Sequence, residues 1–332
     1  MLHFWHEQIT FKPVEVRDVS LQGKTAIVTG ANTGVGFQTC RQLLDLGLSK
    51  LVLGVRNEQK GRDAAAKLSL GRDLAKDAIE VWLLDHSSYE SVIAFAERTR
   101  SLERLDLMNL NVGFAPTKRV FNENTGHDEV IQVNYLSNAL LAILLLPVAK
   151  EKRANQSQPS RITLTSSEVS GWTKFKERTT PGPLLATLDK KEGEVSMADR
   201  MFVSKLLGQF FLAKLAAEVA PSVAIINGAS PGACHDTEFN RDFDKTFLGA
   251  IYKTFLKRAA NSSAIGARMM TDAIVHHGEE THGQFLSFQK IVPMSPFLYT
   301  EEGKKISEQL WKETMAELSF ARVEDILKTL KE

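Results

Sequence analysis

The sequence predicts an α/β protein in which a doubly wound parallel sheet lies between two layers of helices. Short apolar, β-branched segments alternate with amphipathic segments of helical period between Lys24 and Asn227. A glycine-rich turn joins the first of these strands to the first helix. The chain has 332 residues, 43% of them hydrophobic, so it can bury a core large enough for such a sheet.

Each element is justified by its composition. Segments with the short, apolar pattern of buried strands are Lys24–Val28, Leu51–Val55, Ile79–Leu84, Leu105–Leu110, Arg161–Thr165 and Val223–Asn227. The helical segments between them are Phe37–Leu46, Glu58–Leu68, Tyr89–Thr99, Asp128–Lys150 and Arg200–Val219. Right-handed crossovers then place the helices on both faces of a parallel sheet. The result is a three-layer α/β/α sandwich, the Rossmann fold.

We expect residues 1–22 to form a leader segment that packs on the outside, and residues 23–332 to form a single nucleotide-binding domain. Two irregular stretches, 168–199 and 231–262, follow the carboxyl ends of strands, where open α/β sheets bind ligands. Long loops of this kind are usually functional, so we expect both to bind substrate. The second stretch is rich in aromatic residues, which could belong to the core or to the wall of an apolar pocket: Phe243, Phe247, Tyr252 and Phe255.

Composition excludes several classes of protein. The 41 basic and 40 acidic residues nearly cancel, which argues against nucleic acid or an anionic membrane as the main partner. The two cysteines, Cys40 and Cys234, cannot form a disulfide framework and suit a reducing compartment. The N-terminus lacks the pattern of a signal peptide, and the longest apolar stretch, Ala139–Ala149, is too short to span a bilayer. We therefore expect a cytoplasmic protein without a membrane span.

One histidine group calls for a separate interpretation. His276, His277 and His282 flank a turn, which makes a metal site conceivable. The turn is acidic and no cysteine cluster lies nearby, so we interpret it as a surface turn and predict no metal.

The turn after the first strand has the composition of a phosphate-binding loop. Glycine lets the backbone approach a pyrophosphate, and the following helix offers unpaired N–H groups. A glycine triplet alone also fits an ordinary strand–helix turn, but its position here favours a dinucleotide site. The residues expected to bind are Gly30, Asn32, Thr33, Gly34, Val35 and Gly36.

Arg56 follows the second strand, where a Rossmann site meets the adenosine ribose. A carboxylate there favours NAD, whereas a guanidinium pairs with the 2′-phosphate of NADP, and the segment Leu51–Asn57 contains no acidic residue. We therefore expect NADP(H), the alternative being a solvated surface arginine. Asp85 closes the third strand and could accept from the adenine amino group or cap the next helix.

These motifs, in this order, resemble those of the short-chain dehydrogenase/reductase family over about residues 22–290. Thr29–Gly36 matches the TGxxxGxG loop, and Asn111-Val112-Gly113 stands where the family has Asn-Ala-Gly beside the adenine ribose. The resemblance further assigns Asn134 to the proton-relay asparagine, Ser167 to the catalytic serine, and Pro231-Gly232 to the turn beside the nicotinamide.

Within the family the chain resembles fungal secondary-metabolite reductases and retinol-dehydrogenase-like enzymes. This resemblance implies a small apolar substrate. Family members commonly pair through the fourth and fifth helices, so the apolar segment Ala139–Ala149 fits either the core or the interface of a homodimer.

The resemblance breaks at one catalytic position. Ser204-Lys205-Leu206 matches the end of the family's TyrxxxLys motif, which places Met201 where the tyrosine belongs. Residues four apart share a helix face, so Met201 and Lys205 should face the same site. In the family the tyrosine exchanges the substrate proton and the lysine holds the nicotinamide ribose. A thioether has no proton to donate, and general acid–base help is worth about 10²–10⁴-fold.

Three functions remain open. The first is an NADP(H)-dependent oxidoreductase with altered proton delivery, which uses another acid or reduces an iminium or activated alkene. The second is a redox-neutral cyclase or isomerase in which Ser167 and Lys205 polarise a carbonyl and the nucleotide is structural. The third is a nucleotide-binding protein without catalysis. Glu168 and Asp199 are candidate replacement acids, although we interpret both as solvated loop charges; Tyr135 adjoins Asn134 but faces elsewhere on its helix.

Overall fold

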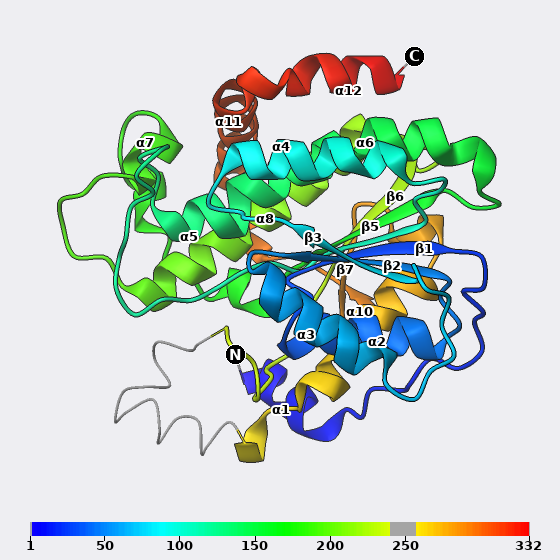
Figure 1. The fold of residues 1–332 in the computed structure, drawn as a ribbon. Coiled ribbons are helices and arrows are strands. Elements are labelled where there is room, and N and C mark those ends of the chain that lie inside the picture. Colours follow the sequence, from blue (N-terminus) through cyan, green and yellow to red (C-terminus); the bar gives the residue numbers. More distant parts are fainter. Residues whose placement is uncertain (1, 240–256, 332) are drawn as a thin grey trace.

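The computed structural model describes residues 2–239 and 257–331 of the chain. Within these residues one eight-stranded sheet has the order β3-β2-β1-β4-β5-β6-β7-β8 (Figure 1). The strands are β1 Thr25–Thr29, β2 Lys50–Val55, β3 Ile79–Leu83, β4 Leu107–Leu110, β5 Ser160–Thr165, β6 Ala224–Ala229, β7 Phe285–Ser287 and β8 Lys290–Val292. Every neighbouring pair is parallel except β7 and β8. The predicted parallel sheet is therefore confirmed, and the antiparallel edge is new.

Helices cover both faces of this sheet, as the alternating pattern predicts (Figure 1). On one face lie α2 Gly34–Asp45, α3 Glu58–Ser69 and α10 Ser263–Val275; on the other lie α4 Tyr89–Arg98, α6 Ser137–Lys152 and α8 Met197–Glu218. Short α5 Glu129–Ile131 and a π-helical segment, Gln132–Leu136, lead into α6. The strand order reverses between β1 and β4, and open α/β sheets bind ligands at the carboxyl ends of strands at such a point.

Helix α6 is part of the core. Almost every residue of Ala139–Ala149 is buried, because α4 packs on one side of α6 and the C-terminal helix α12 Val323–Lys331 on another (Figure 1). Helix α11 Glu301–Glu317 packs against α8 in the same way. The stretch Glu129–Asn155 is apolar enough to cross a membrane, but 89% of its most apolar window is buried inside the protein.

This packing bears on the expected dimer. The two helices expected to pair are α6 and α8. In this chain α6 already packs against α12, and α8 against α11. The apolar stretch is thus core, and the homodimer through these helices stays a prediction.

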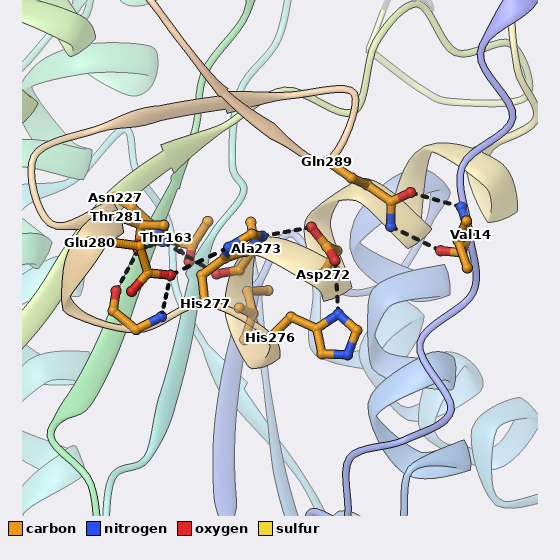
Figure 2. A network of polar contacts seen from close by, with 12 residues as sticks. Val14, Thr163, Asn227, Asp272, Ala273, His276, His277, Glu280, Thr281 and Gln289 are labelled. Carbon is orange, nitrogen blue, oxygen red and sulfur yellow. Dashed lines mark hydrogen bonds and ion pairs between the residues drawn. The ribbon is translucent and has the colours of Figure 1, made fainter.

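The predicted leader contains a helix. Helix α1, Leu2–Thr10, buries Phe4 and Gln8. Beyond it the chain is fastened along the sheet edge: Gln289, in the β7–β8 turn, accepts from N–H of Val14 at 2.7 Å and donates to its carbonyl at 2.9 Å (Figure 2). The division into leader 1–22 and domain 23–332 stays a prediction.

Two of the three histidines hold this edge together. His276 lies 3.0 Å from Oδ1 of Asp272, and His277 lies 2.9 Å from its second oxygen (Figure 2). On its other side, His276 lies 2.6 Å from Oδ1 of Asp18. His282 instead accepts from N–H of Ile226. Among the described residues no three His, Cys, Asp or Glu side chains are grouped to hold a metal ion.

The stretch 168–199 is partly ordered into helical turns, namely η4 Glu168–Gly171, η5 Lys176–Thr179 and α7 Leu184–Leu188. His127 fastens its far end to the C-terminal helices. The Nδ1 atom of His127 lies 2.6 Å from Oδ2 of Asp189, and Nε2 lies 3.0 Å from Oε1 of Glu317 in α11. Burial acts to lower the pKa of His127, but its hydrogen bonds to Asp189 and Glu317 prevail and raise this pKa to about 9.

We expect His127 to make the stability of the protein depend on pH. Because the folded-state pKa is raised above the ordinary value near 6.5, the stabilisation is complete below about pH 6.5 and is lost as pH rises through about 9. Thermal melts of the wild type and His127→Gln between pH 6 and 10 measure this. The difference in Tm should shrink toward pH 10, and a constant difference would show that the charge plays no part.

Candidate functional site

The glycine-rich loop has the geometry of a phosphate-binding turn. Gly30 and Gly34 have φ of 64° and 56°, in the left-handed region that favours glycine. A Cβ at Gly36 would lie 2.5 Å from the carbonyl oxygen of Gly30, so a side chain cannot fit there. Thr33 precedes α2 but makes no side-chain cap, which leaves the N–H groups of the first turn open to an anion. The residues present therefore fit a dinucleotide phosphate.

Asn111 braces this loop from below. Its Nδ2 donates to the carbonyl of Thr29 at 3.0 Å, and its N–H donates to Oγ1 of Thr29 at 2.9 Å. These bonds tie the end of β4 to the end of β1, directly beneath Gly30 and Gly36. The Asn111 amide thus supports the loop, which the sequence pattern did not indicate.

The remaining predicted cofactor residues lie along the same edge. Val35 is buried, while Asn32 and Thr33 are half-buried, and Arg56 is exposed directly after β2. Asp85 accepts from N–H of Ser87 at 2.9 Å, whereas Ser88 caps α4. Our alternative interpretation of Asp85 as the cap of that helix is therefore wrong.

The chain after β6 turns back over the glycine loop. Gly232, with φ of 67°, follows Pro231 and donates to Oγ of Ser230 at 3.1 Å. Farther on, a Cβ at Gly34 would lie 3.2 Å from Cβ of Thr237, and N–H of Ala115 donates to the carbonyl of Phe239 at 3.1 Å. The second predicted loop, 231–262, thus adjoins the cofactor residues where it is described; Phe243, Phe247, Tyr252 and Phe255 lie outside the described residues.

Asn134 sits in the π-helical segment, and its side chain is fully engaged. Oδ1 accepts from N–H of Phe114 at 3.0 Å, and Nδ2 donates to the carbonyl of Phe114 and to Oγ of Ser204. Single π-helical turns occur frequently at functional sites, because they re-aim side chains within a helix. Here the turn holds Asn134 against α8.

Lys205 is brought to the same place from α8. Its Nζ donates to the carbonyl of Thr165 at 2.9 Å, and burial lowers its pKa to about 8. A Cβ at Gly113 would lie 3.6 Å from this Nζ and 3.4 Å from Oδ1 of Asn134. Asn134 and Lys205 also line one small cavity with Thr165. An ammonium has three donors, so Lys205 keeps capacity for a hydroxyl-bearing ligand.

Met201 lies one turn before Lys205 on the same face of α8, and it is half-buried. The preceding residue, Arg200, is almost fully buried and lies 3.3 Å from Oδ2 of Asp128 and 3.2 Å from Oε1 of Glu177. These two ion pairs position the first turn of α8, and with it Met201. Nothing in the local sequence distinguishes Arg200 from a surface arginine.

The described tyrosines do not replace the missing hydroxyl. Tyr135 is buried and bonded to Oγ1 of Thr314 at 2.6 Å, and its pKa is raised by burial. Tyr89 donates to Glu317, and the Tyr299 hydroxyl accepts from N–H of Met294. Tyr135 thus faces the C-terminal helices, as the helical spacing predicts.

Ser167 and Glu168 follow β5, and the side chain of Glu168 lies where the sequence did not predict it. Oγ of Ser167 accepts from N–H of Val169 as the cap of η4. The carboxyl group of Glu168 turns inward and accepts from Oγ of Ser230 at 2.7 Å and from Oγ of Ser287. Both serines are buried. The prediction that Glu168 is a solvated loop charge is therefore wrong, because its own turn folds the carboxyl group between β6 and β7.

The electrostatics of Glu168 are unusual. Burial raises the pKa of its carboxyl group, and the hydrogen bonds from Ser287, Ser230 and Ser167 only partly oppose this.

The other candidate groups near the site have ordinary structural roles. Asp199 accepts from N–H of Lys174 at 2.9 Å and holds the loop to α8. Burial raises the pKa of Cys234 to about 12, so this thiol is neutral and inert.

The leader helix reaches the site as well. The ring of Phe4 lies 5.3 Å from that of Trp172, which in turn lies 6.0 Å from Phe202, next to Met201. Gln8 accepts from N–H of Ala233 at 2.9 Å, just after the Pro-Gly turn. The aromatic wall formed by Phe4, Trp172 and Phe202 thus joins α1, the residue after η4, and α8. Only the apolar residues of the leader hinted at it in the sequence.

Comparisons with known proteins agree with this geometry. Residues 24–174 match the family model described as short chain dehydrogenase. "Short-chain dehydrogenase fogG" of Aspergillus ruber is 42% identical over 99% of this chain and 95% of its own length. "Short chain dehydrogenase virL" of Hypocrea virens is 38% identical over 98% and 94%.

A solved structure, the NADPH-bound carbonyl reductase from chicken fatty liver, has a similar fold. It is 19% identical, covers 82% of this chain and all of that chain, and superposes with a TM-score of 0.58.

Proposed function

Because the chain belongs to the short-chain dehydrogenase family, we propose that it is an NADP(H)-dependent oxidoreductase that acts on a small apolar molecule and delivers the proton in an altered way. The observation that carries the proposal is the meeting of Asn134 and Lys205 beside Gly113, at the carboxyl end of the sheet. In the family these two side chains belong to the catalytic set, which supports an enzyme over a protein that only binds nucleotide. The resemblance to fungal secondary-metabolite reductases supports a role in secondary metabolism.

The chain's own residues have distinct parts in this proposal. The glycine loop and the open first turn of α2 would bind the pyrophosphate, and Arg56 the 2′-phosphate. Lys205 would hold the ribose near Gly113, and the Pro231-Gly232 turn would lie against the nicotinamide. The bound cofactor would supply hydride to the substrate. Ser167 would donate a hydrogen bond to the substrate oxygen.

Apolar side chains near the start of α8 support an apolar substrate. The thioether of Met201 and the rings of Phe202 and Trp172 offer apolar surface. A hydroxyl at position 201 would have added a polar group at this point. We therefore propose an apolar, ring-containing carbonyl compound as substrate.

A redox-neutral cyclase or isomerase is the second candidate. Met201 favours it, because a reaction without net hydride transfer has no use for the family's tyrosine proton. Ser167 and Lys205 would then polarise a substrate carbonyl.

Loss of NADPH absorbance during turnover separates the two candidates. The test uses purified full-length protein with 1-decalone and acetophenone as apolar carbonyl probes. The oxidoreductase consumes one NADPH for each alcohol formed. Conversion of a substrate at constant absorbance would favour the redox-neutral reaction.

Arg56 should determine the choice of cofactor. An exposed guanidinium that bonds the 2′-phosphate adds about 1.5 kcal/mol, the lower end for hydrogen bonds to charged groups. We expect NADPH to bind about tenfold more tightly than NADH, and Arg56→Ala to remove the difference. Fluorescence titration with both cofactors measures it. Arg62→Ala is the control, since Arg62 pairs with Glu58 in α3. Equal affinities in the wild type would contradict the assignment.

A further inference from the structure

Helix α1 of the leader is bonded to the turn that follows β6. We propose that Gln8 of α1 is a positioning residue, which holds the turn Pro231-Gly232-Ala233 in the conformation that receives the nicotinamide half of the cofactor. This inference rests on the proposed function, in which the turn lies against the nicotinamide. It gives the leader a part in the site, which Gln8 plays through the backbone of the turn.

The first argument is the contact itself. The side-chain amide of Gln8 bonds both backbone groups of Ala233: Oε1 accepts from its N–H at 2.9 Å, and Nε2 donates to its carbonyl at 3.2 Å. Because peptide groups are planar, these two bonds fix the orientation of both peptides that flank Ala233. Gln8 is only 2% exposed, and a Cβ at Gly232 would lie 2.6 Å from its Oε1. The amide is therefore packed directly against the turn.

The second argument is the position of the turn between two parts of the candidate site. At the end of β6, Ala229 pairs with Thr165 of β5, whose carbonyl accepts from Nζ of Lys205. Just after the turn, Cys234 packs against the buried cluster that contains Val35, in the first turn of α2. The turn thus runs from beside the Lys205 anchor to beside the glycine loop. A dinucleotide that reaches from that loop to Lys205 passes along it.

The third argument is that the leader is fastened to the domain independently of Gln8. Phe4 is buried in a cluster with Met269 of α10 and Phe288 of the β7–β8 turn, and α1 lies beside α10 (Figure 1). Farther along the leader, Arg268 donates to the carbonyl of Pro13 at 3.2 Å. Helix α1 therefore has a seat of its own, from which Gln8 can support the turn.

The effect of removing the amide is local. The carbonyl of Ala233 also accepts from N–H of Asn261 at 2.9 Å, so it keeps a partner when Gln8 is replaced. The N–H of Ala233 loses its bond to Oε1 of Gln8. We therefore expect the peptide between Gly232 and Ala233 to lose its fixed orientation while the fold around it remains.

Binding of the whole cofactor and of a fragment without nicotinamide tests this role. The variant is full-length Gln8→Met, which keeps the length of the side chain but has no amide. We expect it to bind NADPH about tenfold more weakly, the effect of one good hydrogen bond. Its affinity for 2′-phospho-ADP-ribose, which lacks only the nicotinamide, should match that of the wild type. Calorimetric titration measures both affinities, and general loosening of the protein would lower both.

Gln289→Met is the matched control. Gln289 bonds both backbone groups of Val14 in the leader, as Gln8 bonds those of Ala233, but its bonds do not involve the turn after β6. This variant should bind both ligands as the wild type does, and circular dichroism should show both variants folded.

Three results would overturn the inference: wild-type NADPH affinity in Gln8→Met, an equal loss for NADPH and 2′-phospho-ADP-ribose, or an equal loss in Gln289→Met. An unfolded Gln8→Met would also overturn it, because Gln8 would then support the fold and not the turn. In each of these cases, NADPH consumption by the wild type leaves the proposed function standing. A wild type that does not bind NADPH would overturn both.

Discussion

Replacing Gly36 by alanine should weaken NADPH binding by at least about 100-fold. The new Cβ would lie 2.5 Å from the carbonyl oxygen of Gly30 and 2.7 Å from Nδ2 of Asn111. The loop must therefore shift away from the brace that Asn111 gives it. Each hydrogen bond to a phosphate that this shift breaks costs about 1.5–3 kcal/mol, so the loss of two accounts for the effect. Calorimetric titration with NADPH measures it.

Gly208→Ala is the matched control. Gly208 lies in α8, and a Cβ there would meet nothing within 4 Å. Alanine also has a higher helix propensity, by about 1 kcal/mol. This variant should keep wild-type affinity, and circular dichroism should show both variants folded. Full affinity in Gly36→Ala would show that the phosphates bind elsewhere.

Replacing Met201 by tyrosine should raise the reduction of a generic apolar ketone by about 10²-fold, the lower end of what general acid catalysis provides. Asn134 and Lys205 already stand on the side of α8 that position 201 shares. The backbone of residue 201 should not move, because its carbonyl accepts from Oγ of Ser204 whatever the side chain. Steady-state NADPH oxidation with acetophenone measures the gain.

Met201→Phe is the control, because phenylalanine adds the ring without the hydroxyl. It should match the wild type in rate, and both variants should bind NADPH as the wild type does. Equal rates for the tyrosine and phenylalanine variants would mean that position 201 does not reach the reacting oxygen, and the matching of Met201 to the family's tyrosine would then be wrong.

Local pattern was enough to predict the central sheet. Strands β1 to β6 are short apolar runs bounded by turns, and each lies within about two residues of its predicted place. Strands β7 and β8 have only three residues each, too few for a periodic pattern. The left-handed residues Phe288 and Gln289 between them, with φ of 50° and 57°, also lack the usual turn residues.

The candidate site was predictable only where the contacting residues belong to one continuous sequence motif. The glycine loop is such a motif, since the strand, turn and helix are consecutive. Glu168 is the opposite case: its burial depends on Ser230 and Ser287, 62 and 119 residues away, and nothing in the local sequence distinguishes it from a surface charge. The contact of Phe4 with Trp172 likewise joins distant segments. Such contacts are set by the packed fold and not by local pattern.

Transfer of deuterium from 4-deuterated NADPH to the substrate tests the central claim most directly. The wild type is incubated with 1-decalone and NADPH deuterated on either face of the nicotinamide, and the alcohol is analysed by mass spectrometry. We expect one deuterium per alcohol from one of the two cofactors and none from the other, with one NADPH consumed. Conversion of the probe without deuterium uptake and without NADPH loss would contradict an oxidoreductase and favour redox-neutral chemistry at Ser167 and Lys205.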